Sequence, residues 1–203
     1  MMQNAARQNT SPDPLASAIA HCRAVESYRV NIRSSHIEGE EHLEYYYKKP
    51  GFVRMEFIQP HTGTVLIYNP YTKNVRMWPF GVKRYPELSM SDGNTRIKHS
   101  SGLCSDQSDV EKLFDNVQTL QENGNTEIIG EETMDGNTVL HLTVSGANGF
   151  AIAGVHCYEL WLDTANLFPV KVTSHNQKDA IIETVQLDAL EIEARLPLSL
   201  FNP

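Results

Sequence analysis

Four short runs of aromatic and β-branched residues between Glu40 and Trp78 constrain the fold more than any other part of the chain. The segment reads EEHLEYYYKKPGFVRMEFIQPHTGTVLIYNPYTKNVRMW, and KKPG, QPHTG and NPYTKN separate the runs. These separators contain Pro, Gly and Asn, which fix or tolerate the backbone angles that turns require. The segment therefore predicts an antiparallel meander of strands about five to eight residues long.

The same alternation of apolar and polar residues recurs along the rest of the chain. Tyr28, Val30 and Ile32 share one face of a predicted strand, while Arg29 and Arg33 lie on the other. Strands are predicted at 27–35, 40–49, 52–58, 65–68, 75–80, 127–132, 138–144, 155–163, 169–174 and 180–190. Two segments instead repeat apolar residues every three or four positions, which predicts helices at 12–26 and 106–122.

These elements predict a large, strongly bent antiparallel sheet. A sheet with one apolar face needs cover, so we expect both helices to pack on its concave side. The chain is long enough for one substantial core, and residues 12–203 are predicted to form a single domain. Residues 81–105 show no sustained period and are rich in Ser, Gly and Asn, so we expect them to be mobile and to gate the enclosed space.

Composition argues against nucleic acid as a partner. The formal net charge is −8 and the sequence pI is about 5.4, whereas phosphate backbones are bound by concentrated Lys and Arg. No basic run exceeds two residues, and no apolar stretch approaches the length of a membrane span. Residues 1–11 read as a flexible lead without the features of a signal peptide. The chain is therefore either cytoplasmic or an exported protein whose signal or anchor has been removed.

The reactive residues form no known catalytic or metal-binding motif. Cys22, Cys104 and Cys157 have neither a CxxC nor a zinc-ligand spacing, and buried small side chains are favoured over a disulfide between Cys104 and Cys157. The eight histidines include no HxxxH or HExxH pattern. His99-Ser100-Ser101 lacks the GxSxG turn of hydrolases. We therefore expect no catalytic residue, no metal and no cofactor.

Four segments of the chain resemble one known family. They read LEYYYKKPGFVRMEF, LIYNPYTKNVRMWP, YELWLDTANLFPVKV and IEARLPLSLF, and Trp161, Asp163 and Pro169 in the third match the family's Trp-Asp pattern followed by Pro. From residue 12 to its end, the chain resembles a divergent member of the LolA-like group, the periplasmic carriers that sort lipoproteins to the outer membrane. The resemblance implies an unclosed antiparallel β-barrel of about 10–11 strands, lidded by two or more helices. It also implies that acyl chains are held in the apolar interior without covalent chemistry.

Two positions depart from the family pattern. The family's Arg before the strand-joining Pro, which helps to hold the lid shut and drives ligand release, is Lys49 in this chain. Lys is a point charge without the planar fork of Arg. The usual Asp-Gly turn between the next two strands is replaced by Asn69-Pro70-Tyr71. These changes favour a relative with the same scaffold and another cargo.

Aromatic and apolar residues of the strands and the second helix are the candidates for lining a ligand cavity. The candidate cavity residues are Tyr45, Tyr47, Met55, Phe57, Trp78, Leu113 and Val117. Lys49 and Arg54 are the candidates for contact with a headgroup or with the lid. An outward-facing Arg54 in a salt bridge is the alternative.

The function expected from the sequence is that of a non-enzymatic carrier in the bacterial cell envelope. It would hold the acyl chains of a lipoprotein or another lipid, act as a monomer, and lie in the periplasm or at the envelope rather than in the cytoplasm. A lipid- or partner-sensing regulatory domain on the same fold, with an envelope protein as its partner, is the alternative. An enzyme ranks last because no nucleophile or metal constellation supports it.

Overall fold

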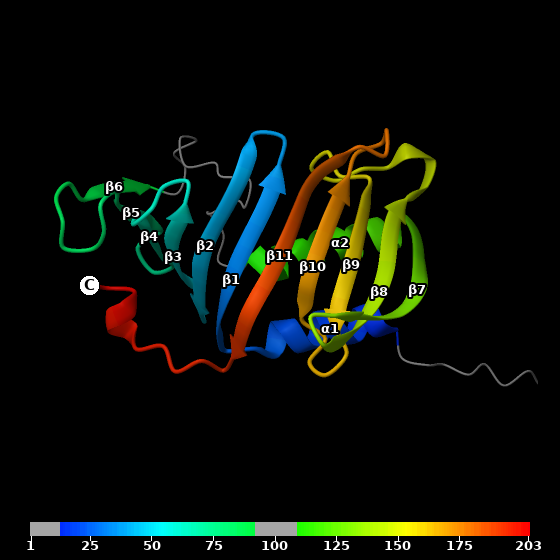
Figure 1. Ribbon diagram of the computed structural model, residues 1–203, viewed down its shortest axis with the longest axis horizontal. Helices are drawn as coiled ribbons and strands as arrows, with labels where there is room; N and C mark the ends of the chain where they lie inside the picture. The colour runs from blue at the N-terminus through cyan, green and yellow to red at the C-terminus, as the bar shows by residue number, and fades with distance from the viewer. Residues whose placement is uncertain (1–12, 92–108) are drawn as a thin grey trace, which may run out of the picture.

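The computed structural model describes residues 13–91 and 109–203, and these form one antiparallel sheet of eleven strands with two α-helices packed on one face (Figure 1). The helices are α1 (Pro14–Ala24) and α2 (Asp109–Glu122). The strands are β1 (Ser27–His36), β2 (Gly39–Lys48), β3 (Phe52–Gln59), β4 (Val65–Asn69), β5 (Asn74–Trp78), β6 (Leu88–Ser91), β7 (Gly124–Met134), β8 (Asn137–Gly146), β9 (Cys157–Asp163), β10 (Pro169–His175) and β11 (Ile181–Ile192). The predicted lead at 1–11 lies outside the described residues. Within the described residues, no helix has both the length and the apolar character needed to cross a membrane.

The strands follow the order β6-β5-β4-β3-β2-β1-β11-β10-β9-β8-β7. β1 pairs with β11, and Tyr28 lies opposite Ile192, so the first and last strands of the chain meet in the middle of the sheet. β6 and β7 are the two edges of this order, which leaves the barrel unclosed. The predicted architecture, an unclosed antiparallel sheet lidded by helices, is confirmed.

Alternate residues along the strands form two apolar clusters on opposite faces of the sheet. Tyr45 of β2 and Met55 of β3 are register partners, and both pack in the cluster that includes α1 and α2. Ile67 of β4 and Trp78 of β5 belong to a second cluster without helix residues. We call the face that packs against the helices the inner face and the opposite one the outer face.

The chain after β11 crosses the outer face and covers the second cluster. Phe201 is buried against Phe52, with ring centroids 5.5 Å apart. Lys48 Nζ donates a hydrogen bond to the carbonyl of Leu196 at 2.7 Å. Further along the tail, Arg54 Nη1 donates to the carbonyl of Leu200 at 2.8 Å. Figure 1 shows this tail, in red, running from the end of β11 towards the side of the sheet that holds β3 to β6. Strands β3 to β5 are therefore buried on both faces.

The two helices are fixed at their ends and to each other. The Asp13 carboxylate caps the start of α1 by accepting a backbone N–H at 3.0 Å. Arg23 Nη2 of α1 donates to Asp115 Oδ1 of α2 at 2.7 Å. Just after α2, Gly124 passes so close to β8 that an added Cβ would lie 1.9 Å from the carbonyl oxygen of Ser145. Only glycine fits this crossing from helix to strand.

The structure has one strand more than the sequence predicts. Leu88–Ser91 forms β6 and pairs with β5, within the segment 81–105 that has no sustained period. Four residues that include two serines are too few to show an alternating pattern, so pairing with β5 determines this strand. The rest of the expected gate, residues 92–105, lies outside the described residues.

Candidate functional site

The inner face of the sheet is an apolar wall that spans both halves of the strand order. It follows from period-two alternation, because every second residue of each strand points to this face. The buried wall residues are Tyr28, Val30, Leu43, Tyr45, Tyr47, Val53, Met55, Phe57, Leu66, Tyr68 and Val75 from β1 to β5, and Leu142, Val144, Tyr158, Leu160, Leu162, Val172 and Leu187 from β8 to β11. A ligand that covered this wall would need a long apolar surface.

Aromatic rings occupy the middle of the wall. The ring of Tyr28 lies 5.8 Å from that of Tyr45 in a stacked arrangement and 5.3 Å from that of Tyr47. Phe168 meets the Tyr28 ring edge-on, at 5.2 Å. Such pairs are favourable beyond the area that they bury. Burial raises the pKa of Tyr45 and of Tyr47 well above its usual value, so both phenols stay neutral.

The two helices cover the wall with one apolar stripe each. The buried helix residues are Leu15, Ala18, Ile19 and Cys22 from α1, and Val110, Phe114, Val117 and Leu120 from α2. Burial raises the pKa of the Cys22 thiol to about 12, so this free cysteine is a packing residue rather than a nucleophile. The apolar stripes of both helices are thus buried against the wall.

A cavity of about 340 Å³ lies at a different place, at the end of the sheet where β7 turns into β8. Its lining includes the carboxylates of Asp135, Asp163 and Asp188 and no residue of either α-helix. Arg33 forms an ion pair with Asp188, and Asp163 Oδ1 accepts the backbone N–H of Ala165 at 2.7 Å. Two of the three acids are therefore already partnered, and of the described wall residues, Leu187 alone also lines this cavity.

Six of the seven predicted cavity residues come together at the inner face. Tyr45, Tyr47, Met55, Phe57 and Val117 are buried there, and Leu113 is half-buried against the same cluster. Trp78 does not join them, because Val75 and Met77 hold the inner positions of β5 and Trp78 is out of phase with both. It packs on the outer face, where the guanidinium of Arg76 lies 4.6 Å from its ring centroid.

The two predicted headgroup or lid residues lie in different places. Arg54 is on the outer face, where Nε donates to Glu56 Oε1 at 2.7 Å and Nη1 donates to the carbonyl of Leu200 at 2.8 Å. This is the outward, salt-bridged alternative. Lys49 Nζ donates to the carbonyl of Arg23 at 2.9 Å and to Glu26 Oε1 at 3.1 Å. Lys49 therefore contacts the end of α1, one of the two helices that cover the wall.

Acidic groups lie at the start of α2. The backbone N–H of Asp109 donates to Tyr45 Oη at 3.3 Å. Asp109 is half-buried as a residue, but its Oδ2 is enclosed and has no hydrogen-bond partner among the described residues. This burial raises the pKa of Asp109 to about 7, with Lys112 lowering it and Glu183 raising it further. Burial also raises the pKa of Glu183.

Asp109→Asn is expected to remove a loss of stability that wild type shows as pH rises. In the unfolded chain Asp109 loses its proton near pH 3.8, whereas in the folded protein it keeps the proton up to about pH 7. Between pH 3.8 and about pH 7 the folded protein holds one more proton than the unfolded chain. The free energy of unfolding therefore falls as pH rises through this range, by at most about 1.4 kcal/mol per pH unit, and this group no longer changes it at higher pH. Urea unfolding of both proteins at pH 5 and pH 8 measures the effect. An equal difference between variant and wild type at both pH values contradicts it.

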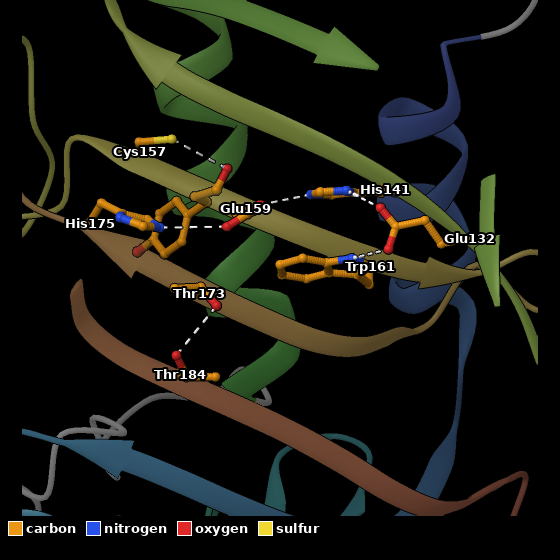
Figure 2. Close-up of polar contacts among 9 residues, drawn as sticks. Glu132, His141, Cys157, Glu159, Trp161, Thr173, His175 and Thr184 are labelled. Carbon is orange, nitrogen blue, oxygen red and sulfur yellow. Dashed lines mark hydrogen bonds and ion pairs between the residues drawn. The ribbon is translucent and has the colours of Figure 1, made fainter. Parts of the chain in front are cut away.

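The outer face of β7 to β10 carries a network of ionisable side chains (Figure 2). Glu132 accepts from His141 Nδ1 at 2.6 Å and from Trp161 Nε1 at 3.3 Å. Glu159 lies 2.9 Å from His141 Nε2 and 3.6 Å from His175 Nε2. The His141 ring stacks on Trp161, with centroids 4.3 Å apart. The hydrogen bond from His141 holds the pKa of Glu132 below its usual range.

The sequence gives little sign of this network. His141 and Trp161 are twenty positions apart, and only the register of β8 with β9 sets them side by side. Once the register of β8 with β9 is known, His141 and Trp161 are directly paired and must lie on the same face of the sheet. Within the described residues, no group of three or more His, Cys, Asp or Glu side chains has a geometry that could hold a metal ion. Through Glu132, the network links the edge strand β7 to His141 of β8 and Trp161 of β9, so we assign it a structural role.

Comparison with known proteins finds relatives through structure alone, since neither a protein-family model nor a curated protein sequence matches the chain. An uncharacterized conserved protein from Thermus thermophilus is 11% identical, with a TM-score of 0.58 over 93% of this chain and 91% of that chain. The Mycobacterium tuberculosis lipoprotein LppX is 12% identical, with a TM-score of 0.53 over 92% of this chain and 99% of LppX. The Pseudomonas aeruginosa MucA/MucB complex contains a chain that is 15% identical, with a TM-score of 0.53 over 93% of this chain and 59% of the matched one.

A LolA superfamily protein from Nitrosomonas europaea also matches, at 10% identity and a TM-score of 0.40. At these identities, a match shows a shared fold and leaves the function to be argued from the site. The matches with TM-scores above 0.5 show that this chain shares the fold of the Thermus thermophilus protein, of LppX and of a chain of the MucA/MucB complex.

Proposed function

We propose that this protein is a non-enzymatic binding protein of the bacterial cell envelope, which holds the acyl chains of a lipoprotein or another lipid. The ligand would lie between the inner face of the sheet and the two helices. Tyr45, Tyr47, Met55, Phe57 and Val117 would line its site, together with Leu113. The proposal places the protein in the periplasm or at the envelope, as a monomer.

The observation that carries the proposal is the predominantly apolar wall on one face of an unclosed sheet, covered by two described α-helices. Each helix presents one apolar stripe to the wall. An acyl chain offers the same kind of surface as these stripes, so it can replace helix side chains against the wall without leaving polar groups unpaired. The closed arrangement described here is then the ligand-free state.

To admit a ligand, the helices would have to move away from the sheet. This movement would begin where polar contacts near the solvent hold a helix in place. Lys49 and Glu26 form an ion pair at the end of α1, with Glu26 largely exposed. Exposed ion pairs contribute little free energy, so this one can break at small cost. Lys49 would then be available to meet an anionic headgroup at the rim of the wall. No covalent chemistry is required in this account, because burial of the chain alone supplies the affinity.

A matched pair of substitutions tests the site. Leu113 of α2 is half-buried against the inner cluster, and Leu200 of the C-terminal tail is half-buried against the outer cluster. Leu113→Glu and Leu200→Glu therefore make the same chemical change on opposite sides of the sheet. Leu113→Glu is expected to weaken binding of palmitate by at least about tenfold, because a carboxylate would border the acyl chain. Displacement of a fluorescent fatty acid measures both variants. Equal affinities of both variants, or stronger weakening by Leu200→Glu, would contradict the proposed site.

A lipid- or partner-sensing regulatory domain is the second candidate. It is favoured by the match to a chain of the MucA/MucB complex, which shows that this fold occurs in a protein–protein complex. A sensor would change its affinity for one defined envelope protein when palmitate binds, whereas a carrier would transfer the lipid to an acceptor. Measuring lipid transfer to acceptor vesicles, with and without Leu113→Glu, separates the two.

A further inference from the structure

The edge strand β7 has an open side. It pairs with β8 along its whole length and is the last strand of the sheet order, so no described strand lies on its other side. It contains eleven residues, and most of them are exposed. The opposite edge, β6, has only four residues. A long exposed edge presents a row of unpaired backbone groups that can accept another strand.

The side chains of β7 are acidic and apolar. The strand reads GNTEIIGEETM, with three glutamates and no Lys, Arg or His. Ile128 and Ile129 are 53% and 51% exposed. Glu132 is held by His141 and Trp161, while Glu127 and Glu131 are exposed to solvent. A bulge between Ile128 and Gly130 shifts the register, so Glu127 lies opposite Thr143 and Glu131 opposite Leu140.

This shift places the two exposed glutamates on opposite faces of the sheet, because Thr143 and Leu140 are three residues apart on β8. A cationic side chain on either face of an added strand would therefore meet a carboxylate. The exposed Ile128 and Ile129 would contact apolar side chains between the cations.

A second copy of the same strand is a poor occupant of this edge. Self-pairing would bring the three glutamates of each copy together along one seam, with no Lys, Arg or His in either strand to offset them. Like charges gathered at short range repel each other. The bulge adds a local bend that a flat self-paired ribbon does not share.

We propose that β7 is a docking edge for an extended, basic segment of a partner protein, which adds to the sheet as a twelfth strand. Backbone hydrogen bonds would supply the affinity common to strand addition, and Glu127, Glu131 and the two isoleucines would supply the selectivity. The site is separate from the inner wall, and it stands whether or not the wall binds lipid.

Synthetic peptides test this edge directly. The probes are a ten-residue peptide of repeated Lys-Val, its Glu-Val counterpart, and the Lys-Val peptide with all backbone nitrogens methylated. Only the first is expected to bind, since the second has the wrong charge and the third cannot complete the hydrogen-bond ladder. On binding, hydrogen exchange should slow in residues 124–134. Equal binding of either control peptide, or slowing confined to other strands, overturns the proposal.

Charge reversal supplies the matched variants. E127K/E131K is expected to weaken binding of the Lys-Val peptide at least about tenfold, because the peptide's lysines would meet a lysine instead of a carboxylate on whichever face they lie. E38K/E40K makes the same change of net charge at exposed positions near the hairpin between β1 and β2, and it should keep the affinity within about threefold. Equal loss in both variants would show an effect of net charge alone and would overturn the assignment to β7. So would a stable dimer of the wild-type protein that E127K/E131K dissociates.

Discussion

Phe201→Ala is expected to lower the free energy of unfolding by about 3–5 kcal/mol, although the residue is third from the end of the chain. Phe201 is 1% exposed and packs against Phe52 within the outer cluster, so truncation would leave a cavity beneath the tail. The tail's polar contacts cannot compensate, because they hold the backbone rather than fill the space. Urea unfolding followed by tryptophan fluorescence measures the change, since Trp78 lies in the same cluster.

Leu198→Ala is the control for this substitution. Leu198 lies in the same tail but is 59% exposed, so its truncation should change the free energy of unfolding by less than about 0.5 kcal/mol. If Phe201→Ala were as mild as Leu198→Ala, the tail would not be an integral part of the outer cluster.

The affinity for saturated fatty acids is expected to rise steeply with chain length. Each buried CH₂ contributes about 0.8 kcal/mol, so four more carbons add about 3 kcal/mol, or roughly 200-fold in Kd between laurate and palmitate. Displacement of a fluorescent fatty acid, at concentrations below micelle formation, measures the series. Equal affinities for laurate and palmitate would show that the chain stays outside the protein, and that the headgroup alone is bound.

The sequence predicts the inner face well because alternation within one strand is a local property. Tyr45 and Tyr47 of β2, and Met55 and Phe57 of β3, follow from the period of two, and all four lie on the wall. The helices are equally local, since a stripe such as Val110, Phe114 and Val117 repeats within its own segment. The pairing of β1 with β11 joins distant parts of the chain. The prediction of their inner-face residues does not depend on it, because each strand shows its own alternation of apolar and polar residues.

The outer face is less predictable because its burial depends on a remote segment. Trp78 and Arg54 are aromatic and charged residues in strands that have apolar side chains on both faces. A strand pattern cannot tell which face the helices cover and which face the C-terminal tail covers. The IEARLPLSLF segment is visible in the sequence, but its packing on Phe52 depends on contacts about 150 residues apart. The network around His141 depends on strand register in the same way.

The most direct test of the account is the position of a bound acyl chain. Palmitate carrying a diazirine near its methyl end can be bound, activated by light, and located by mass spectrometry of the digested protein. The account predicts that the labelled peptides contain inner-face residues such as Met55, Leu66 or Val117, and that excess palmitate abolishes the label. Labelling confined to outer-face residues such as Ile67 or Phe201 would contradict it.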